Sequence, residues 1–140
     1  MTTLQNRIND AISEFSTLEN IEDRYRLLIT YGKNLPPMEV SLKTDDNLIR
    51  GCQSQVWLHA TISPSQDKII LAGDSDAAIT KGIAALLIKI YSESSPSEIL
   101  NTKTDFIDKI GIKEHLSQNR SNGLAAMLKQ IIFFAYSKKL

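Results

Sequence analysis

The sequence predicts an α+β fold in which a small antiparallel sheet is flanked by helices. Apolar residues recur with helical spacing near both ends of the chain and again after residue 76. Between the first two helical segments and the later ones, residues 56–62 alternate apolar and polar residues, the pattern of a strand with one buried face. Helices and strands are therefore grouped rather than interleaved, which favours α+β over a parallel βαβ array.

Two helices are predicted before the sheet. The first follows Thr3, a plausible cap, and the second follows Asn20 and ends near Gly32, ahead of two prolines. The apolar stripe of the first helix is Leu4, Ile8, Ile12 and Phe15, and that of the second is Ile21, Tyr25, Leu28 and Ile29. Residues 36–46 are predicted to be a connecting loop, because Pro, Asp, Ser and Thr dominate them.

The sheet is predicted to be a hairpin with a third strand beside it. Residues 56–62 form one strand, residues 63–67 the turn, and residues 68–72 the second strand. Leu48-Ile49 is the expected third strand. This arrangement places Gly51 and Cys52 in a sharp turn between strands.

A central helix is predicted after the sheet, which residues 73–76 end. Ser75 is the expected cap, and the helix dipole favours the negative charge of Asp76 in the first turn. The apolar stripe consists of Ile79, Ile83, Leu86 and Ile90, widened by Ala84 and Leu87. A helix this apolar should lie across the sheet as the central core element.

Three further helical segments complete the chain. Ser95-Pro96-Ser97-Glu98 has the pattern of a capping box with proline at the first helical position. A short segment at 104–110 ends at Gly111, and the last helix begins within residues 117–121. Its inward residues are expected to be Leu124, Met127, Ile131 and Phe134.

Composition excludes several classes of function. The chain has 140 residues, about one domain's worth, so we expect a single domain over residues 1–140. Sixteen basic residues balance sixteen acidic ones, which argues against binding to nucleic acid or to anionic membranes. The apolar run at 83–90 is too short to span a bilayer, and the first seven residues do not resemble a secretory signal. One cysteine cannot form an internal disulfide, and we expect a cytoplasmic protein.

Cys52 is the strongest candidate for chemistry. It lies in the polar turn Arg50-Gly51-Cys52-Gln53-Ser54-Gln55, where the cation of Arg50 favours the thiolate. His59 is roughly 20 Å away along an extended chain, and nothing local requires His115 to approach the thiol. One cysteine and two scattered histidines do not form a metal-binding pattern. We interpret the sequence at 74–76 as a helix start rather than a cation site.

Three motifs together resemble one family. They are Gly51-Cys52-Gln53-Ser54-Gln55-Val56-Trp57, then Gly73-Asp74-Ser75-Asp76-Ala77-Ala78-Ile79-x-Lys81-Gly82, then Arg120-Ser121-Asn122-Gly123-Leu124. The chain resembles the SufE family of sulfur acceptor proteins over nearly its whole length. It departs at Ser117-Gln118-Asn119, where relatives often have a proline ahead of the arginine.

The resemblance implies a function, a fold and a site. SufE-like proteins take sulfane sulfur from a SufS-type cysteine desulfurase, stimulate that enzyme, and pass the sulfur to a SufBCD-type scaffold during iron–sulfur cluster assembly. Cys52 would carry the persulfide, and the fold would be similar to that of the IscU scaffolds. Loop-positioning or partner roles are implied for Arg50, Gly51, Gln53, Asp76 and Arg120. The carrier needs no cofactor, because pyridoxal phosphate belongs to the desulfurase, and homodimers are an expectation by analogy.

Two alternatives stay open. A self-sufficient cysteine hydrolase would use Cys52 with His115, and a partner-binding adaptor would not need the cysteine. For the sulfur carrier we also predict that the Cys52 sulfur rests in an apolar pocket near Val56, Trp57, Leu124 and Met127. The loop would swing out when the desulfurase docks, because a permanently exposed persulfide would lose its sulfur to small thiols.

Overall fold

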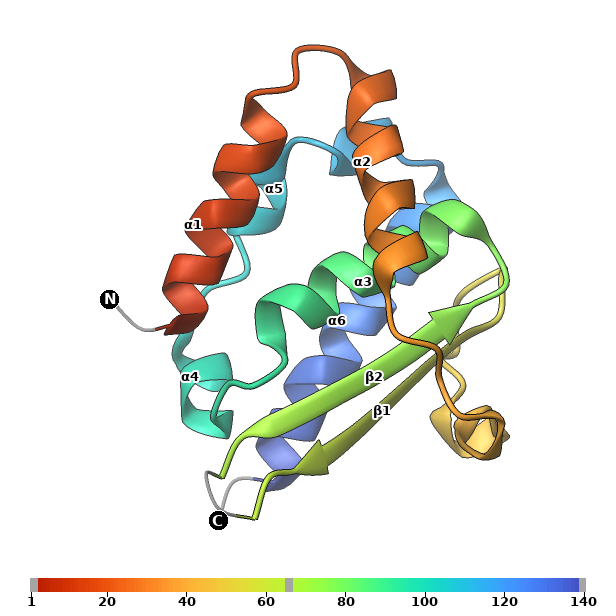
Figure 1. Cartoon of the computed structure of the whole chain (residues 1–140), viewed down its shortest axis with the longest axis vertical. Helices are drawn as coiled ribbons and strands as arrows, with labels where there is room; N and C mark the ends of the chain where they lie inside the picture. The colour runs from red at the N-terminus through yellow and green to blue at the C-terminus, as the bar shows by residue number, and fades with distance from the viewer. Residues whose placement is uncertain (1–2, 65–66, 139–140) are drawn as a thin grey trace.

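The computed structural model describes residues 3–64 and 67–138, and its helices and strands follow the predicted order (Figure 1). The elements are α1 (Thr3–Ser16), α2 (Ile21–Asn34), β1 (Val56–Ile62), β2 (Ile69–Ser75), α3 (Ala78–Tyr91), α4 (Pro96–Asn101), α5 (Phe106–Ile110) and α6 (Gln118–Lys138). Short 3₁₀ turns lie at Val40–Leu42, Asp45–Asn47 and Lys113–His115. The α+β prediction is confirmed. No helix within the described ranges is long and apolar enough to cross a membrane.

The sheet is an antiparallel pair of strands, and the predicted third strand is wrong. Val56 lies opposite Ser75 in the hairpin. The expected third strand is reduced to one bridge between Leu48 and Trp57, beside a 2.7 Å hydrogen bond from the Ile49 N–H to the Val56 carbonyl. The chain between the 3₁₀ turn that ends at Asn47 and the next turn is too short to continue the ladder.

Ser75 is not the cap of α3, which corrects the second prediction in this region. Strand β2 continues to Ser75, and Ala77 occupies the cap position without a side-chain hydrogen bond. Pairing with Val56 holds Ser75 in the sheet, two residues ahead of the cap. Its hydroxyl instead donates to the Gln55 carbonyl (2.8 Å) and accepts from the Ala77 N–H (3.3 Å).

The other helix signals have clear structural counterparts. The Asn20 side chain accepts from the Asp23 N–H at 2.9 Å, which caps α2. Ser95 and Glu98 form the predicted capping box at α4, with both hydrogen bonds at 3.1 Å. Helix α1 begins at Thr3, so Thr3 is the first helical residue, and the cap position before it lies outside the described residues. Helix α6 begins at Gln118, within the expected range despite the missing proline.

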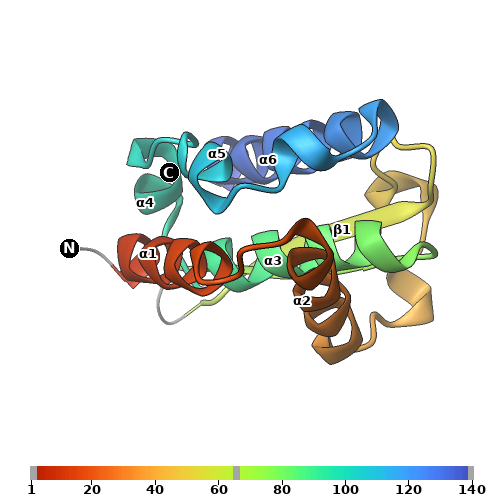
Figure 2. The ribbon, with the colours of Figure 1, turned by 90° about the horizontal axis from the view of Figure 1, so that it is seen from above.

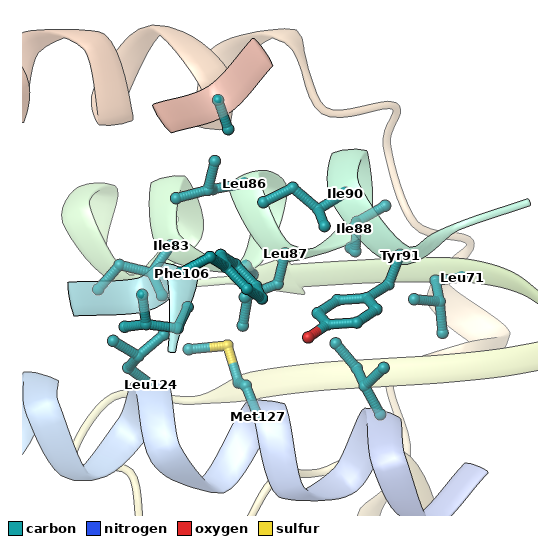
Figure 3. Packing of buried hydrophobic residues seen from close by; sticks show 14 of the residues in the cluster. Leu71, Ile83, Leu86, Leu87, Ile88, Ile90, Tyr91, Phe106, Leu124 and Met127 are labelled. Carbon is teal, nitrogen blue, oxygen red and sulfur yellow. The ribbon is translucent and has the colours of Figure 1, made fainter. Parts of the chain in front are cut away.

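Helix α3 is the centre of the core, as its composition predicts. It contacts β2, α1, α2 and α6, and Figure 2 shows α4, α5 and α6 on one side of it and α2 on the other. Its buried surface is wider than one stripe, because all of residues 82–88 are buried. Figure 3 shows Leu87 and Tyr91 of α3 packed among Phe106 of α5 and Met127 of α6.

Helices α2 and α3 approach closely at two glycines. Gly32 of α2 faces Gly82 of α3, and a Cβ on Gly82 would lie 2.2 Å from the carbonyl oxygen of Leu28. That contact is with backbone, which cannot rotate away. The absence of a side chain at residue 82 therefore sets the distance between the two helices.

We predict that Gly82→Ala destabilises the protein by about 2–3 kcal/mol, because overpacking forces the backbones apart. Helix propensity alone predicts the opposite sign, a gain of about 1 kcal/mol. Denaturant unfolding of both proteins measures the difference. Asn122→Ala on the exposed face of α6 is the control for propensity, and unchanged or increased stability in Gly82→Ala would contradict the packing argument.

Candidate functional site

Cys52 lies on a loop that is closed at its base. We call residues 50–55 the cysteine loop; it connects the Leu48–Trp57 bridge to β1. Gly51 has φ of 92°, in the left-handed region that glycine enters without a steric penalty. This turn directs Cys52 back toward α6.

The far end of the cysteine loop is fixed to the start of α3. The Gln55 N–H donates to Oδ1 of Asp76 (3.0 Å), and the Gln55 carbonyl accepts from the Asp76 N–H (3.2 Å). The Ser75 hydroxyl donates to the same carbonyl. Asp76 therefore holds the loop by binding the backbone of Gln55. The interpretation of residues 74–76 as a helix start did not predict this contact.

A second contact joins the loop to α6. The side chain of Asn119 donates from Nδ2 to Oε1 of Gln53 at 2.7 Å. Both side chains are exposed, so water competes for this bond. Backbone bonds at Gln55 and one side-chain bond at Gln53 thus hold Cys52 between two helix starts.

The Cys52 thiol is half-buried against α6. A Cβ on Gly123 would lie only 3.2 Å from Cys52 Sγ, so the sulfur packs on the bare backbone of α6. Burial raises the pKa of Cys52 above its ordinary value, because it disfavours the thiolate. The resting residue is therefore a protonated thiol.

A cavity of about 340 Å³ opens beside this thiol. Its lining is Cys52, Gln53, Ser54, Ala77, Thr80, Ser117, Asn119, Arg120 and Gly123. The predicted shelter is thus more polar than expected, and Val56, Trp57, Leu124 and Met127 are not part of its lining. Val56 and Met127 are fully buried in the core, while the cavity lies where the first turns of α3 and α6 present polar groups.

The structure brings some of the predicted site residues together and leaves others apart. Gln53 and Arg120 line the cavity with Cys52, and Asp76 contacts the loop through Gln55. Arg50 and Gly51 are exposed and do not line the cavity. The arginine that lines the cavity is therefore Arg120, from a segment distant in sequence.

Neither histidine lines the cavity. His59 lies on β1 with Nδ1 3.4 Å from Oδ1 of Asn47, and His115 is exposed in the 3₁₀ turn before α6. The lining also contains no carboxylate. Within residues 3–64 and 67–138, no three His, Cys, Asp or Glu side chains gather as metal ligands would.

Six lining residues were not among the predicted site residues: Ser54, Ala77, Thr80, Ser117, Asn119 and Gly123. Thr80 carried a detectable signal. It lies one turn before Ile83 and Ala84 on an otherwise apolar face, where a polar residue needs an explanation. The other five have ordinary identities for a loop or for the start of a helix, and no sequence pattern separates them from that role.

An ion-pair cluster supports the chain before the loop. Asp74 on β2 contacts Lys43 at 2.6 Å and Lys81 at 3.4 Å. Burial by itself raises the pKa of Asp74, but the Lys43 and Ser75 hydrogen bonds and the two lysine charges outweigh it and lower the pKa. The cluster joins the segment before the cysteine loop to the sheet and to α3.

Comparison with known proteins identifies the family. The family model for the SufE Fe-S metabolism associated domain matches residues 9–135. The chain belongs to the SufE family. Membership gives this SufE domain a role in iron–sulfur metabolism.

Relatives of this SufE protein occur in bacteria and plants. An uncharacterized SufE-like protein of Rhizobium meliloti (strain 1021) is 43% identical over 129 residues, covering 89% of this chain and 91% of the relative. One from Rhizobium etli is 40% identical over 127 residues, covering 89% and 86%. SufE-like protein 1, chloroplastic/mitochondrial, of Arabidopsis thaliana is 37% identical over 123 residues, covering 88% of this chain and 33% of the plant protein.

The fold itself is also found in a solved structure. The solution structure of a hypothetical protein from Thermus thermophilus matches with a TM-score of 0.78. The match covers 94% of this chain and 95% of that chain, at 23% sequence identity. At this identity the likeness extends to the fold and supports the α+β assignment.

We predict that Cys52 reacts with iodoacetamide several-fold more slowly than a model thiol at neutral pH. Its raised pKa lowers the thiolate fraction, so the rate should continue to rise at pH values where a free thiol has levelled off. Gly123→Ala should displace Sγ and accelerate the reaction, with Asn122→Ala as the matched control. A wild-type rate equal to that of the model thiol would rule out the sheltered state.

We predict that Asp76→Ala increases the alkylation rate of Cys52 about fivefold, because one lost hydrogen bond is worth about 1 kcal/mol of loop closure. Asp46→Ala, in the exposed 3₁₀ turn before the loop, is the control for removal of a carboxylate. Equal rates in the wild type and Asp76→Ala would show that the Gln55 contact does not restrain the loop.

Proposed function

We propose that this SufE protein is a sulfur carrier for iron–sulfur cluster assembly. It accepts sulfane sulfur from a SufS-type cysteine desulfurase as a persulfide on Cys52, stimulates that enzyme by removing its product, and passes the sulfur to a SufBCD-type scaffold. The family assignment supports the pathway, and the position of Cys52 supports the residue. We place this activity in the cytoplasm.

The single observation that carries the proposal is the environment of the only cysteine. Cys52 lies on a loop between two short anchors, half-buried beside a cavity whose lining contains no histidine or carboxylate. Such a thiol has no general base of its own in the described part of the chain. It suits a reaction in which the partner supplies the activated sulfur.

Transfer by exchange needs no base, metal or cofactor on the acceptor. The Cys52 thiolate attacks the outer sulfur of the donor persulfide, a new S–S bond forms at Sγ, and the donor S–S bond breaks. The donor cysteine leaves as a thiolate, so no net oxidation occurs. Pyridoxal phosphate belongs to the desulfurase, where it releases the sulfur from free cysteine.

Docking must change the reactivity of Cys52. In the resting position burial keeps the thiol protonated, which makes it a poor nucleophile. Opening the cysteine loop breaks the Gln53–Asn119 hydrogen bond, and a wider opening also breaks the hydrogen bonds between Gln55 and Asp76. We therefore expect the desulfurase to bind the open loop and to restore an ordinary thiol.

The hydrolase alternative lacks the pairing of a thiol with a base. A cysteine hydrolase requires the thiol and a base within hydrogen-bond reach, and an orienting group behind the base. His115 is not among the residues that line the cavity of Cys52. We do not propose hydrolysis as a second function.

We predict that incubation with a SufS-type desulfurase and cysteine adds sulfur to Cys52 and accelerates alanine release. Intact mass before and after reduction measures the added sulfur, and amino-acid analysis measures alanine. Cys52→Ser should lose both effects. If Cys52→Ser stimulates the desulfurase as well as the wild type does, the protein is an adaptor whose cysteine is incidental. Turnover of thioesters without a partner would instead favour the hydrolase.

A further inference from the structure

Thr80 is a buried polar side chain that faces the cavity beside Cys52. It is only 5% exposed and lines that cavity from the first turn of α3. Its hydroxyl has no hydrogen-bond partner among the described residues. Every side-chain oxygen that is fully enclosed in those ranges does have a partner. The hydroxyl of Thr80 is therefore not fully enclosed, and the space that this residue lines is the cavity.

The starts of two helices add further donors to the same space. Ala77 and Thr80 belong to the start of α3, which has no side-chain cap, so N–H groups of its first turn remain available. Ser117 and Asn119 belong to the start of α6, where the Ser117 hydroxyl accepts only from the Arg120 N–H (3.3 Å). Helix starts favour anions. Arg120 lines the cavity as well, and no ion pair engages it within the described residues.

These donors do not serve the resting thiol. The effect on the Cys52 thiol is that of burial, which opposes ionisation. A second sulfur on Sγ would lie about 2 Å further out. The cavity of about 340 Å³ has room for that atom and for water.

We propose that Thr80, together with the starts of α3 and α6 and Arg120, forms a binding subsite for the anionic terminal sulfur of a Cys52 persulfide in the closed loop. This inference rests on the proposed function and extends it with a residue that holds the cargo. The Thr80 hydroxyl donates to the terminal sulfur, and the helix starts and the guanidinium favour its negative charge.

The chemical consequence is retention of the sulfur. A small thiol removes it by attack of a thiolate on the terminal sulfur, which breaks the bond to Sγ and releases the Cys52 thiolate. The protonated persulfide is the better electrophile, since the anionic form repels the incoming thiolate. A site that keeps the terminal sulfur ionised and hydrogen-bonded therefore slows its loss.

The test loads Cys52 without any desulfurase. Glutathione persulfide serves as donor: the Cys52 thiolate takes its outer sulfur, and glutathione leaves as a thiolate. After removal of the donor, reduced glutathione is added and the persulfidated fraction is followed by intact mass. The proteins compared are the wild type, Thr80→Val, Thr80→Ser and the control Thr61→Val, which changes an exposed threonine of β1.

We expect Thr80→Val to lose its sulfur roughly tenfold faster than the wild type, because a hydrogen bond to a charged group is worth at least this factor. Thr80→Ser, which keeps the hydroxyl, should remain within about twofold of the wild type, and Thr61→Val should match it. Equal retention in Thr80→Val and the wild type would overturn the proposal. So would equally fast loss from Thr80→Val and Thr80→Ser, since packing and not the hydroxyl would then be responsible, and so would failure of the wild type to retain sulfur.

The two proposals fail separately. If the desulfurase adds no sulfur to Cys52 but the hydroxyl dependence holds for protein loaded by glutathione persulfide, the sulfur source is wrong and the subsite stands. If the desulfurase loads Cys52 but Thr80→Val retains sulfur normally, the carrier function stands and the subsite is wrong.

Discussion

The complete burial of residues 82–88, the middle of α3, is the constraint on which the rest of the structure depends. Helix α3 contacts the sheet, both amino-terminal helices and α6, which lie around it (Figures 1 and 2). Gly82 allows α2 to approach until backbone meets backbone, so the helix cannot move without opening this contact. A core packed this closely transmits the position of α3 to every element that touches it.

The same helix determines where the candidate site lies. Because β2 leads directly into α3, the start of α3 lies beside the end of the hairpin from which the cysteine loop projects. Packing of α6 on α3 brings the start of α6 to the other side of that loop. Cys52 is thus held between two helix starts, with Gly123 providing the space for its sulfur.

The position of Cys52 combines a buried, protonated thiol with a loop that can open. Burial protonates the thiol and protects it, while the loop that carries it is held by few hydrogen bonds, one of them between exposed side chains. Segments held by few and partly exposed contacts open at low free-energy cost. A rigid core and a weakly held loop are together suited to the sulfur carrier that we propose, which must retain its sulfur and release it to a partner.

The sequence by itself determined the fold class, the order of the elements and Cys52 as the candidate residue. These depend on local signals: the period of apolar residues, the caps at Asn20 and Ser95, and the polar turn around a single cysteine. Local signals did not predict the ends and the number of the strands, because these depend on pairing between distant segments. Strand β2 ran on to Ser75 because Val56 lies opposite it, and the third strand failed because too few extended residues remained.

Only the tertiary structure decided what surrounds the thiol. The cavity is lined by three segments, the cysteine loop, the start of α3 and the start of α6, and no periodicity records which helix starts will meet. The sequence analysis named both Arg50 and Arg120, and the structure places Arg120 in the lining of the cavity and leaves Arg50 out of it. Thr80 was visible as a polar residue on an apolar face, but the role that we propose for its hydroxyl depends on the packing of α3 against α6 beside Cys52.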